Sequence, residues 1–105
     1  MLRAEWMKLT LSEQSVVVVT KDQVSCDLDG EAAILHIKKG VYYGLDPVGA
    51  YVWKLLQQPQ CVGELRNAVL QTYEVDSEQC QRDVVGLLEN LLSEGLIEVR
   101  DGSAA

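Results

Sequence analysis

The sequence predicts a single α+β domain with a small antiparallel sheet. Strand-like segments with alternating apolar residues fill its first half, and segments with apolar residues at helical spacing fill its second half. A chain of 105 residues with 48% hydrophobic content is long enough to close one core but short for two. We therefore predict one domain over residues 1–105, with its core over about residues 16–99 and less ordered ends.

A hairpin begins the predicted sheet. Val24–Leu28 and Glu31–Ile37 are the two strand-like segments, and they flank Asp29-Gly30. This dipeptide tolerates the positive φ angles of a tight two-residue turn. Alternation along the second strand places three of its apolar residues on one shared face: Ala33, Leu35 and Ile37.

A third strand follows the turn at Lys39-Gly40. Over Val41–Leu45, the residues Val41, Tyr43 and Leu45 alternate with Tyr42 and Gly44, and we expect this strand at an edge of the sheet. Val16–Val19 fits either another short strand or a packed extended arm.

Two helices are predicted next. Asp46 can cap the first, which begins at Pro47, runs to about Gln57 and cannot continue through Pro59. The second spans about Val62–Tyr73, although Cys61 stands where a capping hydroxyl is usual.

The third predicted helix begins after Asp76, whose side chain can cap it while Gln79 reaches back, and it ends at Gly95. Leu96–Val99 alternates weakly, as a final short strand or wing does. The helix carries an apolar stripe wider than one neighbour needs, formed by Val84, Val85, Leu87, Leu88, Leu91 and Leu92.

The charge of the chain excludes several partners. Sixteen acidic residues against nine basic ones give a formal net charge of −7, which repels phosphate backbones and anionic membrane surfaces. The longest purely aliphatic run, Val16–Val19, is too short for a signal-peptide core or a membrane span. We expect a cytoplasmic protein with no nucleic-acid or membrane partner.

Catalytic and metal-binding patterns are not evident. The spacing of Cys26, Cys61 and Cys80 fits neither a disulfide framework nor a zinc site, so three reduced cysteines are expected. His36 is the single histidine, and no nucleophile with an orienting partner lies near it in the sequence. We predict a protein that is not an enzyme and needs no cofactor or metal.

Three helices that end in a short strand look like a winged-helix domain. Four stretches stand out within this pattern: the run YYGLDPVGAYVWKLL from Tyr42 to Leu56, Glu64-Leu65, Asp83–Leu88 and Glu94–Ile97. Together they resemble the PqqD-like family, and the resemblance covers about Val24–Val99. Asp46 departs from the asparagine that relatives often carry, and Cys61 from the usual capping hydroxyl.

That family includes the pyrroloquinoline quinone biosynthesis protein D and the stand-alone recognition proteins of lasso-peptide biosynthesis, together called recognition elements for ribosomally synthesised, modified peptides. The resemblance implies an N-terminal three-stranded antiparallel sheet, three helices and a short C-terminal strand. It implies no catalysis, and a precursor leader bound as an added antiparallel strand between strand three and helix three.

The implied site has one side on the third strand and one on the third helix. The strand contributes Val41, Tyr42, Tyr43, Gly44 and Leu45. The helix contributes Asp83, Val84, Leu87, Leu88, Asn90 and Leu91, of which Val84, Leu88 and Leu91 are also expected to be at least partly core. The opposite flank of the helix, with Val85, Glu89 and Leu92, is an alternative because periodicity does not say which neighbour covers which edge.

The sequence thus favours capture of a precursor leader and its delivery to a separate leader peptidase or other modifying enzyme in lasso-peptide biosynthesis. A chaperone of the precursor in pyrroloquinoline quinone biosynthesis is the alternative within the family. A winged-helix DNA-binding regulator is the rival from another class, and the acidic third helix argues against it. An adaptor for a folded protein is a further alternative.

Overall fold

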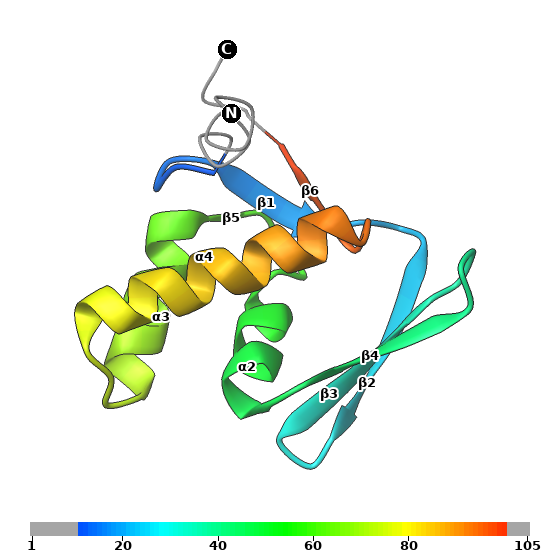
Figure 1. Ribbon diagram of the computed structural model, residues 1–105, viewed down its shortest axis with the longest axis horizontal. Helices are drawn as coiled ribbons and strands as arrows, with labels where there is room; N and C mark the ends of the chain where they lie inside the picture. Colours follow the sequence, from blue (N-terminus) through cyan, green and yellow to red (C-terminus); the bar gives the residue numbers. More distant parts are fainter. Residues whose placement is uncertain (1–10, 101–105) are drawn as a thin grey trace, which may run out of the picture.

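The computed structural model describes residues 11–100, so the predicted chain ends at residues 1–10 and 101–105 lie outside the described residues. Three strands form an antiparallel sheet in the order β2-β3-β4: β2 (Gln23–Leu28), β3 (Glu31–His36) and β4 (Val41–Leu45). Asp29 and Gly30 turn between β2 and β3 with φ angles of 56° and 91°. The predicted hairpin and edge strand are confirmed (Figure 1).

The two faces of this sheet differ in burial. On β3, Ala32, Ile34 and His36 are buried, whereas Ala33 and Leu35 are only partly covered. The apolar face expected for Ala33, Leu35 and Ile37 is therefore the outer one, and Ile37, just beyond the strand, is 54% exposed. The inner face packs on the core because its side chains meet α2.

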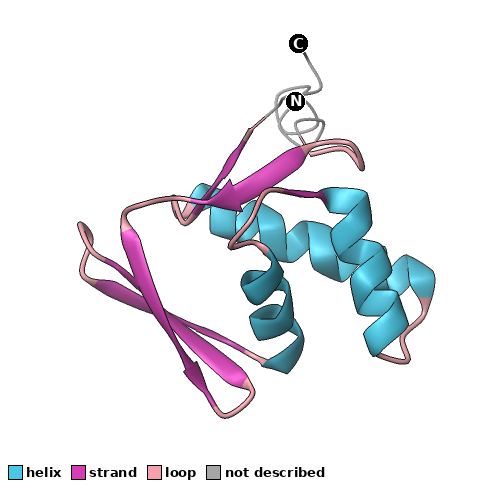
Figure 2. Ribbon diagram, turned by 180° about the vertical axis from the view of Figure 1, so that it is seen from behind, coloured by secondary structure: helices cyan, strands magenta, loops and turns pink. Residues whose placement is uncertain are grey.

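A second sheet joins distant parts of the chain. β1 (Val16–Val19) lies between β5 (Gln60–Cys61) and β6 (Ile97–Val99), in the order β5-β1-β6. This settles the open question of Val16–Val19, which is a strand, and it makes β6 the short C-terminal strand. Figure 2 shows the two sheets as separate units joined by the loop after β1.

The helices are α2 (Pro47–Leu55), α3 (Val62–Thr72) and α4 (Ser77–Ser93). Asp46 caps α2 as expected, since its Oδ1 accepts from the Gly49 amide at 2.8 Å. Cys61 makes no side-chain cap on α3.

The N-terminus of α4 departs from the expected capping pattern in one respect. Asp76 accepts from the Gln79 amide at 3.1 Å, as a cap does. The Gln79 side chain does not reach back, however, and instead donates to Asp83 Oδ1 at 2.8 Å. The reciprocal half of the predicted capping box is therefore wrong, because a carboxylate one turn ahead on the same helix face takes that donor.

The core lies where the three helices meet the two sheets, and the β5-β1-β6 sheet contributes Val17 and Ile97 to it. α4 crosses the molecule from the end of α3 to β6 (Figure 1) and buries Cys80, Val84, Leu88 and Leu91. The sheet of β2, β3 and β4 contributes Ile34 to the same cluster. No helix within residues 11–100 is both long and apolar enough to cross a membrane.

Candidate peptide-binding cleft

A cleft of about 620 Å³ lies between the end of β4, the first turn of α2 and the N-terminal half of α4. Its wall is mainly apolar and is formed by residues of three helices and one strand. The apolar lining residues include Leu45, Val48, Val52, Val69, Val84 and Leu87. Such a concave apolar surface with a few polar groups at its rim is typical of a ligand site.

One side of the cleft is an unpaired strand edge. Within residues 11–100, β4 pairs only with β3. The Gly40 amide donates to the His36 carbonyl at 2.8 Å, so the main-chain groups of His36 point toward β4. Because these directions alternate in an antiparallel pair, the main-chain groups of Tyr42 and Gly44 point to the open side. They are donors and acceptors for a further strand.

The structure brings five of the predicted residues together around this cleft. They are Gly44 and Leu45 from β4, and Asp83, Val84 and Leu87 from α4. The cleft lies on the helix flank of Asp83 and Leu87, and the alternative flank with Val85, Glu89 and Leu92 does not line it.

The remaining predicted residues lie elsewhere. Leu88 and Leu91 are buried in the core, at 0% and 4% exposure, and do not line the cleft. Val41 and Tyr42 are exposed on β4, and Asn90 is exposed one turn beyond the cleft on α4. Periodicity identified the apolar arc of α4 but not which part of it the other helices cover.

Tyr43 connects β4 to the C-terminal end of α4. Its hydroxyl donates to Glu94 Oε1 at 2.7 Å, and Lys39 Nζ lies 3.5 Å from the same oxygen. The hydrogen bond from Tyr43 and the Lys39 charge lower the pKa of Glu94, and this hydrogen bond raises the pKa of Tyr43. Since neither Tyr43 nor Glu94 lines the cleft, the contact lies beyond its end and leaves the N-terminal half of α4 accessible.

This contact predicts a pH dependence of stability. A carboxyl whose pKa is lowered by folding stabilises the fold above its unfolded pKa, and that contribution is lost as the pH falls through the folded pKa. A tyrosine whose pKa is raised loses its contribution as the pH rises through its folded pKa. Tyr43→Phe should therefore flatten the stability profile at both ends, as measured by urea denaturation of both proteins across pH. An unchanged profile would show that the contact does not form in solution.

Several cleft residues were missed from the sequence. Val48 and Val52 come from α2 and Val69 from α3. Val75 lies in the loop before α4, and Cys80 lies near the start of α4. The four helical residues sit in ordinary apolar stripes and Val75 lies in a loop, so no sequence pattern marked any of them as a site residue. Cys80 is 2% exposed, and burial raises the pKa of its thiol. All three cysteines are free.

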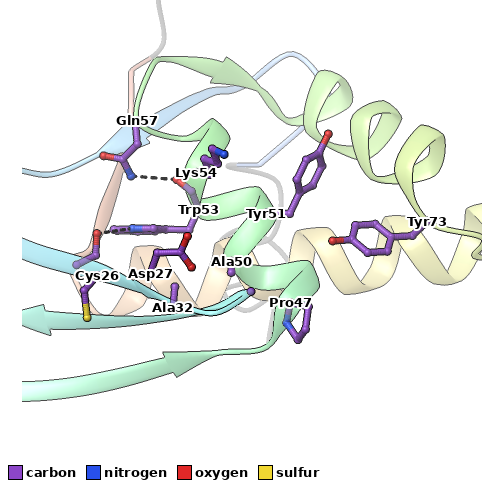
Figure 3. Close-up of a pocket in the computed structure, with 12 residues that line it drawn as sticks. Cys26, Asp27, Ala32, Pro47, Ala50, Tyr51, Trp53, Lys54, Gln57 and Tyr73 are labelled. Carbon is purple, nitrogen blue, oxygen red and sulfur yellow. Dashed lines mark hydrogen bonds between the residues drawn. The ribbon is translucent and has the colours of Figure 1, made fainter.

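A smaller cavity of about 420 Å³ lies between β2 and the other side of α2 (Figure 3). Trp53 Nε1 donates to Ser25 Oγ at 3.0 Å there, and Tyr51 packs edge-to-face on Tyr73. Because Trp53 is 3% exposed, the largest apolar side chain of this cavity offers little surface to a ligand. The cleft beside β4 is therefore the stronger candidate site.

The family models and the solved structures indicate one family. The model of the coenzyme PQQ synthesis protein D (PqqD) family matches residues 31–97, well over half of the chain. The comparison with curated proteins gave no match.

Solved structures include TbiB1 in complex with the TbiA(beta) leader peptide, at 33% identity, with a TM-score of 0.72 over 77% of this chain and 94% of that one. A lasso peptide synthetase B1 complexed with its leader peptide is 18% identical, with a TM-score of 0.69 over 83% and 99% of the chains.

The solution structure of the PqqD part of Methylobacterium extorquens PqqCD, a stand-alone recognition element for ribosomally synthesised and post-translationally modified peptides, has the same fold. It is 18% identical, with a TM-score of 0.69 over 87% of this chain and 97% of that one. On the family match and the likeness to TbiB1, this chain belongs to the PqqD family.

Proposed function

We propose that this protein binds the leader segment of a ribosomally synthesised precursor peptide, which adds as an antiparallel strand to β4 and places side chains in the cleft against α4. The observation that carries the proposal is the unpaired edge of β4 directly beside a largely apolar cleft. Strand addition uses both features, since the edge supplies main-chain hydrogen bonds and the cleft supplies side-chain selectivity.

The expected affinity follows from these two features. The amide and carbonyl groups of Tyr42 and Gly44 allow about four main-chain hydrogen bonds, each worth roughly 1 kcal/mol net. Each apolar side chain that the cleft buries adds about 1.5–3 kcal/mol. Ordering a flexible peptide costs about 1–2 kcal/mol per residue, which removes much of this gain. We expect micromolar to nanomolar binding if at least two side chains are anchored.

Delivery to a separate enzyme is the second part of the proposal, and it is supported by the outer face of the sheet. Val24, Leu28, Ile37 and Tyr42 are 53–72% exposed on or beside that face. Exposed apolar surface of this kind is typical of protein contact sites. Because it lies on the face opposite the core, a leader peptidase or other modifying enzyme can contact it while the leader stays on β4.

Within the family, lasso-peptide biosynthesis is the proposed context. It is supported by the 33% identity with TbiB1, which, like the lasso peptide synthetase B1, was solved with a leader peptide; the lasso peptide synthetase B1 and the PqqD part of PqqCD are each 18% identical to this chain. A role as a precursor chaperone in pyrroloquinoline quinone biosynthesis is the alternative. The protein acts in either case by binding, without catalysis or a cofactor.

Titration with labelled leader peptide tests the proposal. The TbiA(beta) leader is the first probe, and peptides selected from a displayed random library are the second. We expect saturable binding, with protection of the Tyr42 and Gly44 amides from hydrogen exchange because they would be paired in the complex. Binding without protection on β4 would contradict strand addition, and a failure of every probe to bind would contradict peptide capture.

A further inference from the structure

The charged residues that line the cleft are all acidic. Its charged lining residues are Asp46, at the N-cap of α2, and Asp83, on α4, and no lysine, arginine or histidine is among the described residues that line it. Its other walls are apolar or backbone. A peptide that fills the cleft therefore meets an apolar floor and two carboxylates at the rim.

The local structure requires neither of these two negative charges. Asp46 Oδ1 accepts from the Gly49 amide at 2.8 Å, a role that asparagine fills equally well at an N-cap. Asp83 Oδ1 accepts from Gln79 Nε2 at 2.8 Å, which an amide oxygen can also do. Neither carboxylate forms an ion pair with a described residue, so both negative charges are available to a ligand.

The charge of Asp83 acts inside the cleft as well as at its rim. Cys80, one turn before Asp83, is buried and also lines the cleft. Burial is the main reason that the pKa of its thiol is raised, and the negative charge of Asp83 contributes to the same shift. The exposed carboxylate of Asp83 is therefore close enough to the cleft to attract a cationic side chain bound there.

We propose that the cleft selects leader segments in which a large apolar residue and a lysine or arginine lie an even number of positions apart, the first in the cavity and the second beside Asp83 and Asp46. This inference rests on the proposed function and names the class of peptide that the site takes. The even spacing follows from strand addition, because alternate residues of an added strand point to the same face.

The net charge of −7 supports the choice of a cationic partner, since it attracts basic peptides at long range and repels acidic ones. The contribution of the Asp46 and Asp83 charges to peptide affinity should be modest, because both side chains are exposed. Exposed ion pairs change an equilibrium by a few-fold each. The two carboxylates together should favour a cationic peptide over its neutral counterpart by about three- to tenfold.

A displayed library of random short peptides tests this specificity on three proteins. These are the wild type, the isosteric double variant Asp46→Asn/Asp83→Asn, and the control Glu74→Gln/Glu78→Gln. The control loses the same charge at two exposed positions that do not line the cleft. Selected peptides are then titrated in their lysine form and with that lysine acetylated, at low and high salt.

The wild type and the control should both enrich an apolar residue together with lysine or arginine at even spacing. The double variant should keep the apolar enrichment and lose the cationic one, and its preference for unmodified lysine over acetyl-lysine should disappear. Equal cationic enrichment in all three proteins would overturn this inference while leaving peptide capture intact. Selected peptides without an apolar anchor, or no selected peptides at all, would overturn the proposed function and this inference with it.

Discussion

Leu87→Asp should weaken leader binding by about 100-fold or more while the protein stays folded. Leu87 lies on the cleft side of α4 and is only partly buried, so an aspartate there can still reach water. A leader side chain that docked against it would meet a charge in place of an apolar wall, and the largest effects at interfaces come from such central contacts. Fluorescence titration of the labelled leader measures the loss, and circular dichroism checks the fold.

Ile37→Asp is the matched control for this variant. Ile37 is 54% exposed just beyond β3, at the outer face of the sheet and away from the cleft, so the same kind of substitution should leave leader affinity unchanged. Equal losses in the two variants would mean that added negative charge, and not the cleft wall, weakens binding. Unchanged affinity in Leu87→Asp would show that the leader does not use this flank of α4.

Leu88→Ala should give the opposite result, with a large loss of stability and little change in the affinity of the folded protein. Leu88 is the next residue along α4, but it is 0% exposed and belongs to the core. Truncating a buried leucine removes apolar burial and leaves a cavity, which costs about 2–5 kcal/mol of unfolding free energy. That is a substantial part of the stability of a small domain, which is typically about 5–15 kcal/mol.

Urea denaturation measures the stability of Leu88→Ala, and titration at a temperature where it remains folded measures its affinity. Leu87→Ala provides the comparison within one helix turn, because it should lose affinity with a smaller loss of stability. A large affinity loss in folded Leu88→Ala would place Leu88 at the peptide-binding surface and contradict the buried position that the structure gives it.

The sequence located the main elements well because their signals are local. The Asp29-Gly30 turn, the Asp46-Pro47 helix start and the Asp76 cap each depend on residues close together in the chain, and each lies where it was expected. Val41–Leu45 has the predicted bounds and the predicted edge position. The strand of Gln60 and Cys61 was not foreseen, because two residues carry no period and form a strand only by pairing with β1.

The candidate site was only partly predictable. The strand side follows from alternation, which assigned Tyr42 and Tyr43 to opposite faces without saying which face meets the core. On the helix side, Leu87 and Leu88 are equally apolar neighbours, and only the packing of α2 and α3 decides that one lines a cleft while the other is buried. The contact of Tyr43 with Glu94 joins residues 51 positions apart and has no local signal.

The amino-acid sequence by itself determined the α+β order of elements, their starts and stops, the acidic character of the protein and the apolar stripe of the long helix, because these depend on neighbouring side chains and on composition. Only the tertiary structure decided that Val16–Val19 pairs with two strands, that the cleft opens on the Asp83 flank, and that Leu88 and Leu91 face inward. Those outcomes depend on which surfaces pack against each other, and burial of apolar area depends on the whole fold and not on any single segment.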